Sequence, residues 1–279
     1  MKIDVPKNKR RADFARLYTT FHDSAYTRCV NMSLLDCDFG HATSGLQLSH
    51  YNFDENAPTQ IHPLAIIGLV DHSAGSAIYT KIASHLGCST LDLKVDFFSN
   101  NTTDRLIAET KLLSLTEHNA VIFSEVRNAE NQAVASCVGL FRVGAYPGET
   151  VDAEGFSIYQ PGNTRQALLN TLRLQERDGQ CFSPADNPTV IGWAPANVFH
   201  GAATATLLAY SSTQLAKEHN IRQSLKSLHV NFVRPGRGGQ KLTAKSELVR
   251  KGRSASMITA TCHHEDGKTI SYSSATYAD

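Results

Sequence analysis

The sequence has no hydrophobic run long enough to cross a membrane. Its longest unbroken apolar run is Pro63–Val70, whereas a transmembrane helix needs about 20 residues. Residues 1–18 include several basic side chains but no apolar segment of the kind that signal peptides carry. We therefore expect no membrane span and no secretory signal, and we place the protein in the cytoplasm.

Cysteine is scarce and is not arranged for metal binding. The 6 cysteines include no Cys-x-x-Cys pair and no spacing typical of a zinc finger. Cys137 and Cys262 alternate with their neighbours in apparent strands, which predicts that they face a core. We interpret the cysteines as free thiols in a reducing compartment, and we expect no metal site and no bound cofactor.

The sequence also lacks the bias of a disordered or collagen-like chain, with 18 glycines and 9 prolines among 279 residues. An apolar fraction of 41% and a charged fraction of 19% are typical of a globular protein with a sizeable core. The length is compatible with two small domains or one large one.

Net charge is close to zero, at +1, but it is unevenly distributed. Residues 1–150 carry 13 basic and 16 acidic side chains, whereas residues 151–279 carry 14 and 10. Most of the basic excess lies between Arg222 and Arg253, where Glu247 is the one acidic residue. Such a cluster indicates an anionic ligand. Nucleic acid is a poor candidate, because aromatic residues are not interleaved with the basic ones.

The two halves of the chain repeat one order of elements. Residues 62–86 read as a long, largely buried helix, because Ile67, Val70, Ala74, Ala77 and Ile78 recur at helical spacing. Alternating and β-branched runs follow this helix and predict strands. The order recurs from His200 onward, with offsets of 138 residues between His62 and His200 and 136 between Asn131 and Gly267. A helix that is apolar on most sides needs a curved sheet around it.

This order, with its motifs, resembles the hotdog fold of PaaI-like acyl-CoA thioesterases. The resemblance rests on His-Gly at 200–201, on an acid nine residues after His62, and on the run from NFVRPG to HHEDGKTI in the second half. It implies an α+β fold of the double-hotdog type, in which two long central helices are each wrapped by an antiparallel sheet and joined as an intramolecular pseudo-dimer. It also implies that two such chains pair into a homodimer.

The repeat and the resemblance together divide the chain into four parts. These are an N-terminal extension (1–44), a first hotdog unit (45–148), a connector (149–190) and a second hotdog unit (191–279). We expect helices in the extension. The connector contains a predicted helix, Arg165–Glu176, between two turns rich in glycine and proline.

Thioester hydrolysis needs a donor for the developing oxyanion and a carboxylate that activates water or attacks directly. In the family that the sequence resembles, the donor is the backbone N–H of the glycine after the motif histidine. The carboxylate lies nine residues after that histidine, on the partner helix. Each site is therefore shared between two units.

Each half of this chain keeps only one of the two groups. The first half has Asp71 at the carboxylate position but Pro63, which has no N–H, in place of the glycine. The second half has Gly201 but Ala209 at the carboxylate position. Across the pseudo-dimer, Asp71 faces Gly201, which predicts one complete composite site and one that has lost both groups. Small and apolar neighbours place Asp71 on a poorly solvated helix face, where a carboxylate is costly to bury, which favours a functional role. The alternative is that Asp71 is an ordinary helix carboxylate that is solvated or hydrogen-bonded.

Several other residues are weaker candidates by the same resemblance. Thr90 stands where relatives place a small hydroxyl that helps to hold the water. The family often has an asparagine six residues before the motif histidine; Asn56 matches it in the half that carries Pro63, and Asn197 could replace it in the second half. We expect His200 to cap or orient its loop, and His72 to be structural.

The basic run falls where relatives place the loop that meets the phosphates of coenzyme A. The predicted contacts are the side chains of Arg234, Arg237, Lys241, Lys251 and Arg253, with Gly236, Gly238 and Gly239 allowing close backbone approach. For any one of these residues, the alternative is an ordinary charged side chain that contacts only solvent.

The sequence thus predicts a cytoplasmic acyl-CoA thioesterase that acts on a small-molecule substrate at one composite site. Two alternatives stay open. One is a hotdog hydratase or dehydratase that uses a carboxylate and His200 as its acid–base pair. The other is an acyl-CoA-binding protein without catalysis. The sequence does not predict the length of the acyl chain.

Overall fold

The computed structural model describes residues 24, 26–27, 30, 32–47, 53–54, 57–61, 63–82, 86–99, 105–144, 172–193 and 197–279. Its main feature is a sheet of 12 strands in which every neighbouring pair is antiparallel, in the order β1-β2-β6-β7-β8-β5-β13-β16-β15-β14-β10-β9. The strands of the first half are β1 (Met32–Asp38), β2 (His41–Gln47), β5 (Gly87–Phe97), β6 (Arg105–Leu115), β7 (Asn119–Asn128) and β8 (Ala133–Gly144). Those of the second half are β9 (Gln175–Arg177), β10 (Gln180–Ser183), β13 (Ser224–Phe232), β14 (Leu242–Lys251), β15 (Ala255–His264) and β16 (Thr269–Ala278).

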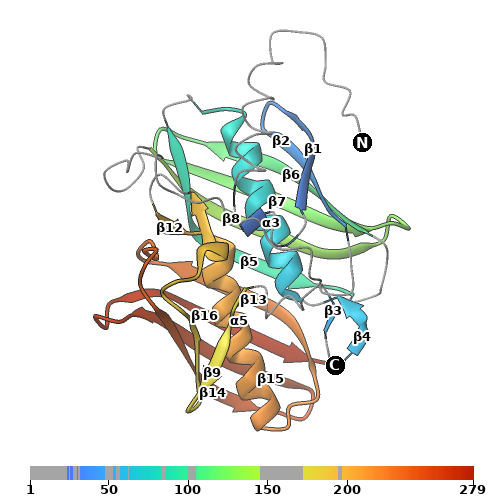
Figure 1. Ribbon diagram of the computed structural model, residues 1–279. Helices are drawn as coiled ribbons and strands as arrows, with labels where there is room; N and C mark the ends of the chain where they lie inside the picture. Colours follow the sequence, from blue (N-terminus) through green and yellow to red (C-terminus); the bar gives the residue numbers. More distant parts are fainter. Residues whose placement is uncertain are drawn as a thin grey trace.

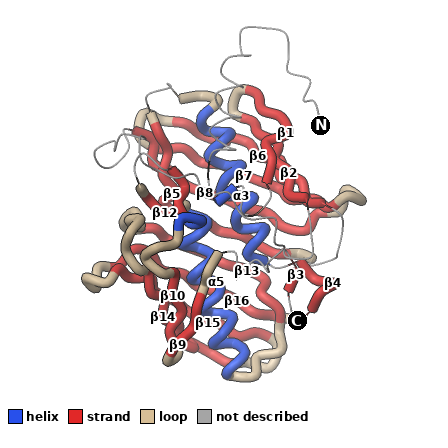
Figure 2. The backbone as a smooth tube through the Cα atoms, in the orientation of Figure 1, coloured by secondary structure: helices blue, strands red, loops and turns tan. Residues whose placement is uncertain are grey.

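Two long helices lie on the same side of this sheet, α3 (Pro63–Tyr79) in the first half and α5 (Gly201–Glu218) in the second (Figures 1 and 2). Two short hairpins complete the described elements. They are β3 (Phe53–Asp54) with β4 (Ala57–Ile61), and β11 (Ile191–Trp193) with β12 (Val198–Phe199), the latter preceded by a 3-10 turn at Pro188–Val190. No helix in the described part of the chain is long and apolar enough to cross a membrane.

The predicted repeat is visible in the strand order. The order β6-β7-β8-β5 on one side of the centre is mirrored by β13-β16-β15-β14 on the other. The two halves join where β5 pairs with β13, with Leu93 opposite Val230 and Val95 opposite Leu228. All four of these side chains are fully buried. The sheet therefore continues from one half into the other without an edge.

The predicted buried helix of the first half is confirmed over most of its length. Five apolar residues at helical spacing are fully buried against the sheet: Ile67, Val70, Ala74, Ala77 and Ile78. The helix ends at Tyr79 rather than near Leu86. Thr80 accounts for this end, because its hydroxyl donates to the Ala77 carbonyl and accepts the Gly40 N–H, bonds that compete with another helical turn.

Two expectations outside the hotdog units are wrong over most of the residues that the structure describes. Tyr26 and Thr27 are helical, but residues 32–47, of which 32–44 belong to the predicted extension, form the hairpin β1–β2 at the edge of the sheet, with Gly40 at positive φ in its turn. Residues 1–23 lie outside the described part. The last two residues of the predicted connector helix, Gln175 and Glu176, belong to β9. An Asp-Gly turn at 178–179, with both φ values positive, folds β9 onto β10. Residues 165–171 lie outside the described part.

Five cysteines fall among the described residues, and each is a free thiol. Cys137 and Cys262 are buried, as their alternation in the sequence predicts.

Candidate active site

Asp71 is a buried carboxylate in the middle of α3. It is 4% exposed, and three polar groups surround it. Its Oδ1 accepts the Thr90 hydroxyl at 2.8 Å, and its Oδ2 accepts the Ala202 N–H at 2.8 Å. The Nδ1 of His200 also lies 3.1 Å from Oδ2. Thr90 comes from β5 of the first half and the other two groups from the start of α5, so both halves hold one carboxylate.

Gly201 begins α5 in direct contact with this carboxylate. A Cβ at position 201 would lie 2.7 Å from Thr90 Oγ1 and 3.0 Å from Asp71 Oδ2. Only glycine therefore allows the helix to approach so closely. The N-terminus of a helix carries unpaired N–H groups and a partial positive charge. Among the described residues, the Gly201 N–H has no protein acceptor. The predicted meeting of Asp71 and Gly201 is present in the geometry.

His200 precedes Gly201 and lies between the two halves. Its Nδ1 is 3.1 Å from the Ala202 nitrogen as well as from Asp71 Oδ2. Its Nε2 is 2.8 Å from Nδ1 of His72, and Nε2 of His72 is 3.3 Å from the Thr27 hydroxyl. The Tyr26 ring stacks on the His200 ring, with centroids 4.7 Å apart. His200 is at the N-cap position, as expected, and it also touches the carboxylate.

A pocket of about 320 Å³ opens beside these groups. One wall is α3, with Asp71 and His72, and another is β5, with Thr90. The start of α5, the loop after β13, β8 and the β11–β12 hairpin also contribute to the lining. Gly75, Ser76, Tyr79, Cys88 and Phe141 are among the lining residues, and Val233, Arg234, Pro235 and Gly236 line it from the β13 loop. The carboxylate and the helix start therefore face a space that can hold a substrate.

The predicted phosphate contacts separate into two groups. Arg234 and Gly236 line the pocket, and the backbone of Arg237 is anchored nearby, where its N–H donates to Nε2 of His264 at 3.3 Å. Lys241 lies over the Phe182 ring, at 4.1 Å from its centroid. These residues form one basic region around the β13–β14 loop.

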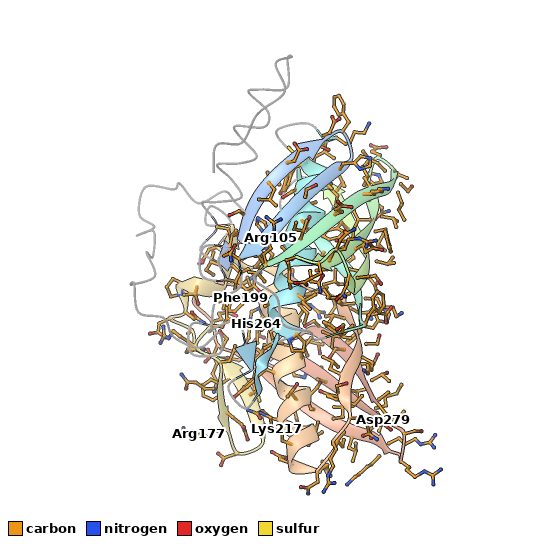
Figure 3. All side chains as sticks on the ribbon, turned by 90° about the vertical axis from the view of Figure 1, so that its right-hand side faces the viewer. Arg105, Arg177, Phe199, Lys217, His264 and Asp279 are labelled. Carbon is orange, nitrogen blue, oxygen red and sulfur yellow. The ribbon has the colours of Figure 1, made fainter. Side chains whose placement is uncertain are left out.

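Lys251 and Arg253 are not part of that region. The Lys251 ammonium donates to the carbonyl of His219, the C-cap of α5, and the Arg253 carbonyl accepts from Gln223. The 18 residues of α5 separate that end from Gly201 by about 27 Å. Figure 3 shows Lys217, close to this end of α5, well away from Phe199 beside its start. The structure does not bring these two residues to the pocket.

Asn197 lies beside the pocket rather than in its lining. Its carbonyl accepts the Gly238 N–H at 2.7 Å, and its side chain lies so close that a Cβ at Gly238 would meet it at 2.0 Å. Asn197 therefore anchors the glycine-rich loop that carries Arg234 and Arg237. Asn56 and His62 lie outside the described residues.

The residues at the other predicted half-site are described in part. Pro63 is the first residue of α3, a position where a missing N–H costs nothing. Ala209 is fully buried in α5. Neither residue can supply an N–H donor or a carboxylate of the kind found at Asp71 and Gly201.

The sequence reasoning did not place Arg142 or Cys88 in the pocket, and it gave His72 a structural role. Arg142 lines the pocket from β8, beside Ser89 of β5, and so brings a cation from the acidic half. Burial raises the pKa of the Cys88 thiol to about 12, and the charge of Asp71 adds to this rise although a hydrogen bond from Tyr79 opposes it. His72, expected to be structural, bonds to His200. The sequence signal for Arg142 is its place between the buried Phe141 and Val143, but that alternation alone does not show what it faces.

Comparisons with known proteins point to one enzyme family. The model of the acyl-CoA thioesterase N-terminal domain matches residues 189–278. The medium/long-chain acyl-CoA thioesterase YigI of Escherichia coli is 29% identical over 141 residues, which cover 44% of this chain and 88% of that protein. The protein of the same name from Salmonella typhimurium is 30% identical over 141 residues, which again cover 44% of this chain and 88% of that protein.

Two solved structures resemble most of the chain. A chain described as an oleoyl thioesterase from Lactobacillus plantarum has a TM-score of 0.59 at 10% identity, and covers 86% of this chain and 97% of its own. An acyl-ACP thioesterase from Bacteroides thetaiotaomicron has a TM-score of 0.56 at 11% identity, and the match covers 85% of this chain and 97% of that one. At such identities the likeness concerns the fold alone. Together with the 30% identity over 88% of the Salmonella protein, it shows that the chain belongs to the hotdog-fold thioesterase family and is a thioester hydrolase.

Proposed function

We propose that the protein is an acyl-CoA thioesterase that releases a free acid and coenzyme A at one composite site within a double-hotdog chain. The observation that carries the proposal is the position of Asp71, a carboxylate of the first half, against the start of α5 in the second. Both groups line one pocket. The curated relatives, which are acyl-CoA thioesterases, match less than half of this chain, in agreement with a chain built from two units.

The reaction needs one base and one oxyanion donor. Asp71 accepts a proton from water as the water oxygen attacks the thioester carbonyl carbon. The carbonyl oxygen becomes an oxyanion that accepts the Gly201 N–H, with the dipole of α5 behind it. When the tetrahedral intermediate collapses, the C–S bond breaks and the coenzyme A thiolate takes up the proton. Thr90 holds Asp71 in place through its hydroxyl.

The basic region around the β13–β14 loop gives the coenzyme A part of the substrate a place to bind. Arg234 lines the pocket and donates to the Thr269 carbonyl at 2.8 Å, which fixes its side chain at the rim. Arg237 and Lys241 lie farther along the same loop. Guanidinium and ammonium groups at the mouth of a pocket suit the phosphates of a nucleotide tail.

The test is thioester hydrolysis by wild-type protein and by Asp71→Asn, followed as thiol release from a panel of acyl-CoAs. We expect the substitution to lower kcat by about 10³-fold, because the amide cannot take a proton from water. Asp92→Asn is the matched control, since Asp92 also bonds to a histidine, His229, but does not line the pocket. Thiol release from none of the acyl-CoAs, or an unchanged kcat in Asp71→Asn, would refute the proposal.

The same assay separates the two alternatives. A hydratase would add water to an enoyl-CoA without releasing thiol. A binding protein without catalysis would retain acyl-CoA without turnover, and Asp71→Asn would leave its behaviour unchanged.

A further inference from the structure

A chain of hydrogen bonds leads from the Asp71 carboxylate through two histidine rings to a buried hydroxyl. Asp71 Oδ2 lies 3.1 Å from His200 Nδ1, and His200 Nε2 lies 2.8 Å from His72 Nδ1. His72 Nε2 lies 3.3 Å from the hydroxyl of Thr27, which is fully buried. The proposed hydrolysis uses Asp71 but assigns no task to the two rings. The rings nevertheless form one continuous line of contacts between the carboxylate and the hydroxyl.

The assignment starts at the Ala202 N–H, which has two acceptors within reach. Asp71 Oδ2 is closer, at 2.8 Å, than His200 Nδ1, at 3.1 Å. A carboxylate also forms the stronger, charge-assisted bond. The N–H points at both acceptors, and the shorter contact makes Asp71 the stronger one. An unprotonated His200 Nδ1 would set its lone pair against the carboxylate oxygen 3.1 Å away, so a proton on Nδ1, donated to Oδ2, favours the contact between the two side chains.

The remaining links follow from the first. A neutral His200 with a proton on Nδ1 has an acceptor at Nε2, and His72 Nδ1 is the donor within reach. His72 then accepts at its own Nε2, where the Thr27 hydroxyl donates. In this arrangement the hydrogen bond at one nitrogen of each ring sets the role of the other nitrogen.

The ring of His200 is held in the plane that this chain needs. Tyr26 stacks on it with an interplanar angle of 17°. From the second half, Gly192 approaches so closely that a Cβ there would lie 2.8 Å from the His200 Cα. The ring is thus clamped between the two halves.

We propose that His72 is a positioning residue of the hydrolytic site, which holds the His200 ring so that its Nδ1–H is directed at Asp71. The inference rests on the proposed function. Asp71 Oδ2 then receives two donors, from Ala202 and His200, whereas Oδ1 receives one, from Thr90. Because each carboxylate oxygen has two lone pairs, Oδ1 is the atom left to take the proton from water.

The test compares three substitutions by kinetics over a range of pH. His72→Leu removes both ring nitrogens, whereas His72→Asn keeps an amide donor where Nδ1 stood. Thr27→Val removes the terminal hydroxyl with little change in shape. We expect His72→Leu to lower kcat by about tenfold with a small change in KM. His72→Asn should keep most of the wild-type rate, and Thr27→Val should fall between them. His229→Asn, on a histidine outside the pocket, is the control.

Ring tautomers give a readout that does not depend on activity. Long-range ¹H–¹⁵N spectra of the wild type should show His200 and His72 each protonated at Nδ1 alone, and in His72→Leu the His200 proton should divide between Nδ1 and Nε2. A wild-type His200 protonated at Nε2, or a His72→Leu profile that matches the wild type, would overturn the inference. Absence of turnover in the wild type would refute the proposed function instead, and the tautomers alone would then decide whether the chain exists.

Discussion

At the scale of single residues, the site depends on how closely Gly201 approaches the Asp71 carboxylate. The two residues are 130 positions apart in sequence, yet a methyl group does not fit between them. The site therefore needs glycine at position 201 as well as a carboxylate at position 71. The same contact makes the site sensitive to the smallest substitution.

Gly201→Ala should lower kcat by about 10²-fold, because the new Cβ must push α5 or Asp71 out of place. Steady-state kinetics on an acyl-CoA measure this loss. The nearest clash is with Thr90 Oγ1 at 2.7 Å, so Thr90→Ala should lessen it, and the double variant should lose less than the product of the single losses. Strictly multiplicative losses would contradict the steric account.

Cys88 lines the pocket but should not serve as a nucleophile. Burial raises its pKa to about 12, and at pH 7.5 fewer than about 1 in 10⁴ of its thiols are ionised. We expect hydrolysis to survive treatment with iodoacetamide at this pH, with peptide mapping showing Cys88 unmodified until the protein is unfolded. Loss of activity in step with alkylation of Cys88 would show that the pocket holds a reactive thiol.

At the scale of elements, the loop between β13 and β14 sets the basic side of the pocket. Arg234 and Gly236 line the pocket at this loop, whereas Lys251 is the last residue of β14 and Arg253 lies just beyond it. The 10 residues of β14 span about 33 Å. A run of charges that looks continuous in the sequence is therefore divided between two ends of the molecule.

Arg234→Ala should raise KM for acyl-CoA by about tenfold and leave kcat nearly unchanged, because it removes a charged contact made equally by substrate and transition state. Lys251→Ala is the matched control and should change neither constant. The assay is the same measurement of thiol release, repeated at low and high salt. An equal effect of both substitutions would show that general charge, and not the loop, attracts the substrate.

Elements also show what sequence reasoning could reach. Asp71 and Gly201 could be paired because the family that the sequence resembles fixes each at a set distance from a histidine and places the carboxylate on the partner helix. The hairpins β1–β2 and β9–β10 were missed, although Asp178-Gly179 is a strong hairpin signal. The chain through His72 and His200 could not be found, because it depends on ring orientations across 128 residues that no local pattern encodes.

At the scale of the whole molecule, two similar halves share one sheet but differ in chemistry. The pairing of β5 with β13 makes the sheet continuous, so the start of α5 is carried against the middle of α3. Asp71 is complemented by Gly201, whereas Pro63 and Ala209 supply neither group. The repeat thus makes one fold from two units and, in our account, one working site.

The central claim is tested most directly by counting binding sites. Isothermal titration of the wild-type chain with a thioether analogue of acyl-CoA, which has no hydrolysable bond, gives the number of sites per chain. Our account predicts one site per chain, with binding weakened by Arg234→Ala. Two equivalent sites per chain, or binding that Arg234→Ala leaves unchanged, would contradict it.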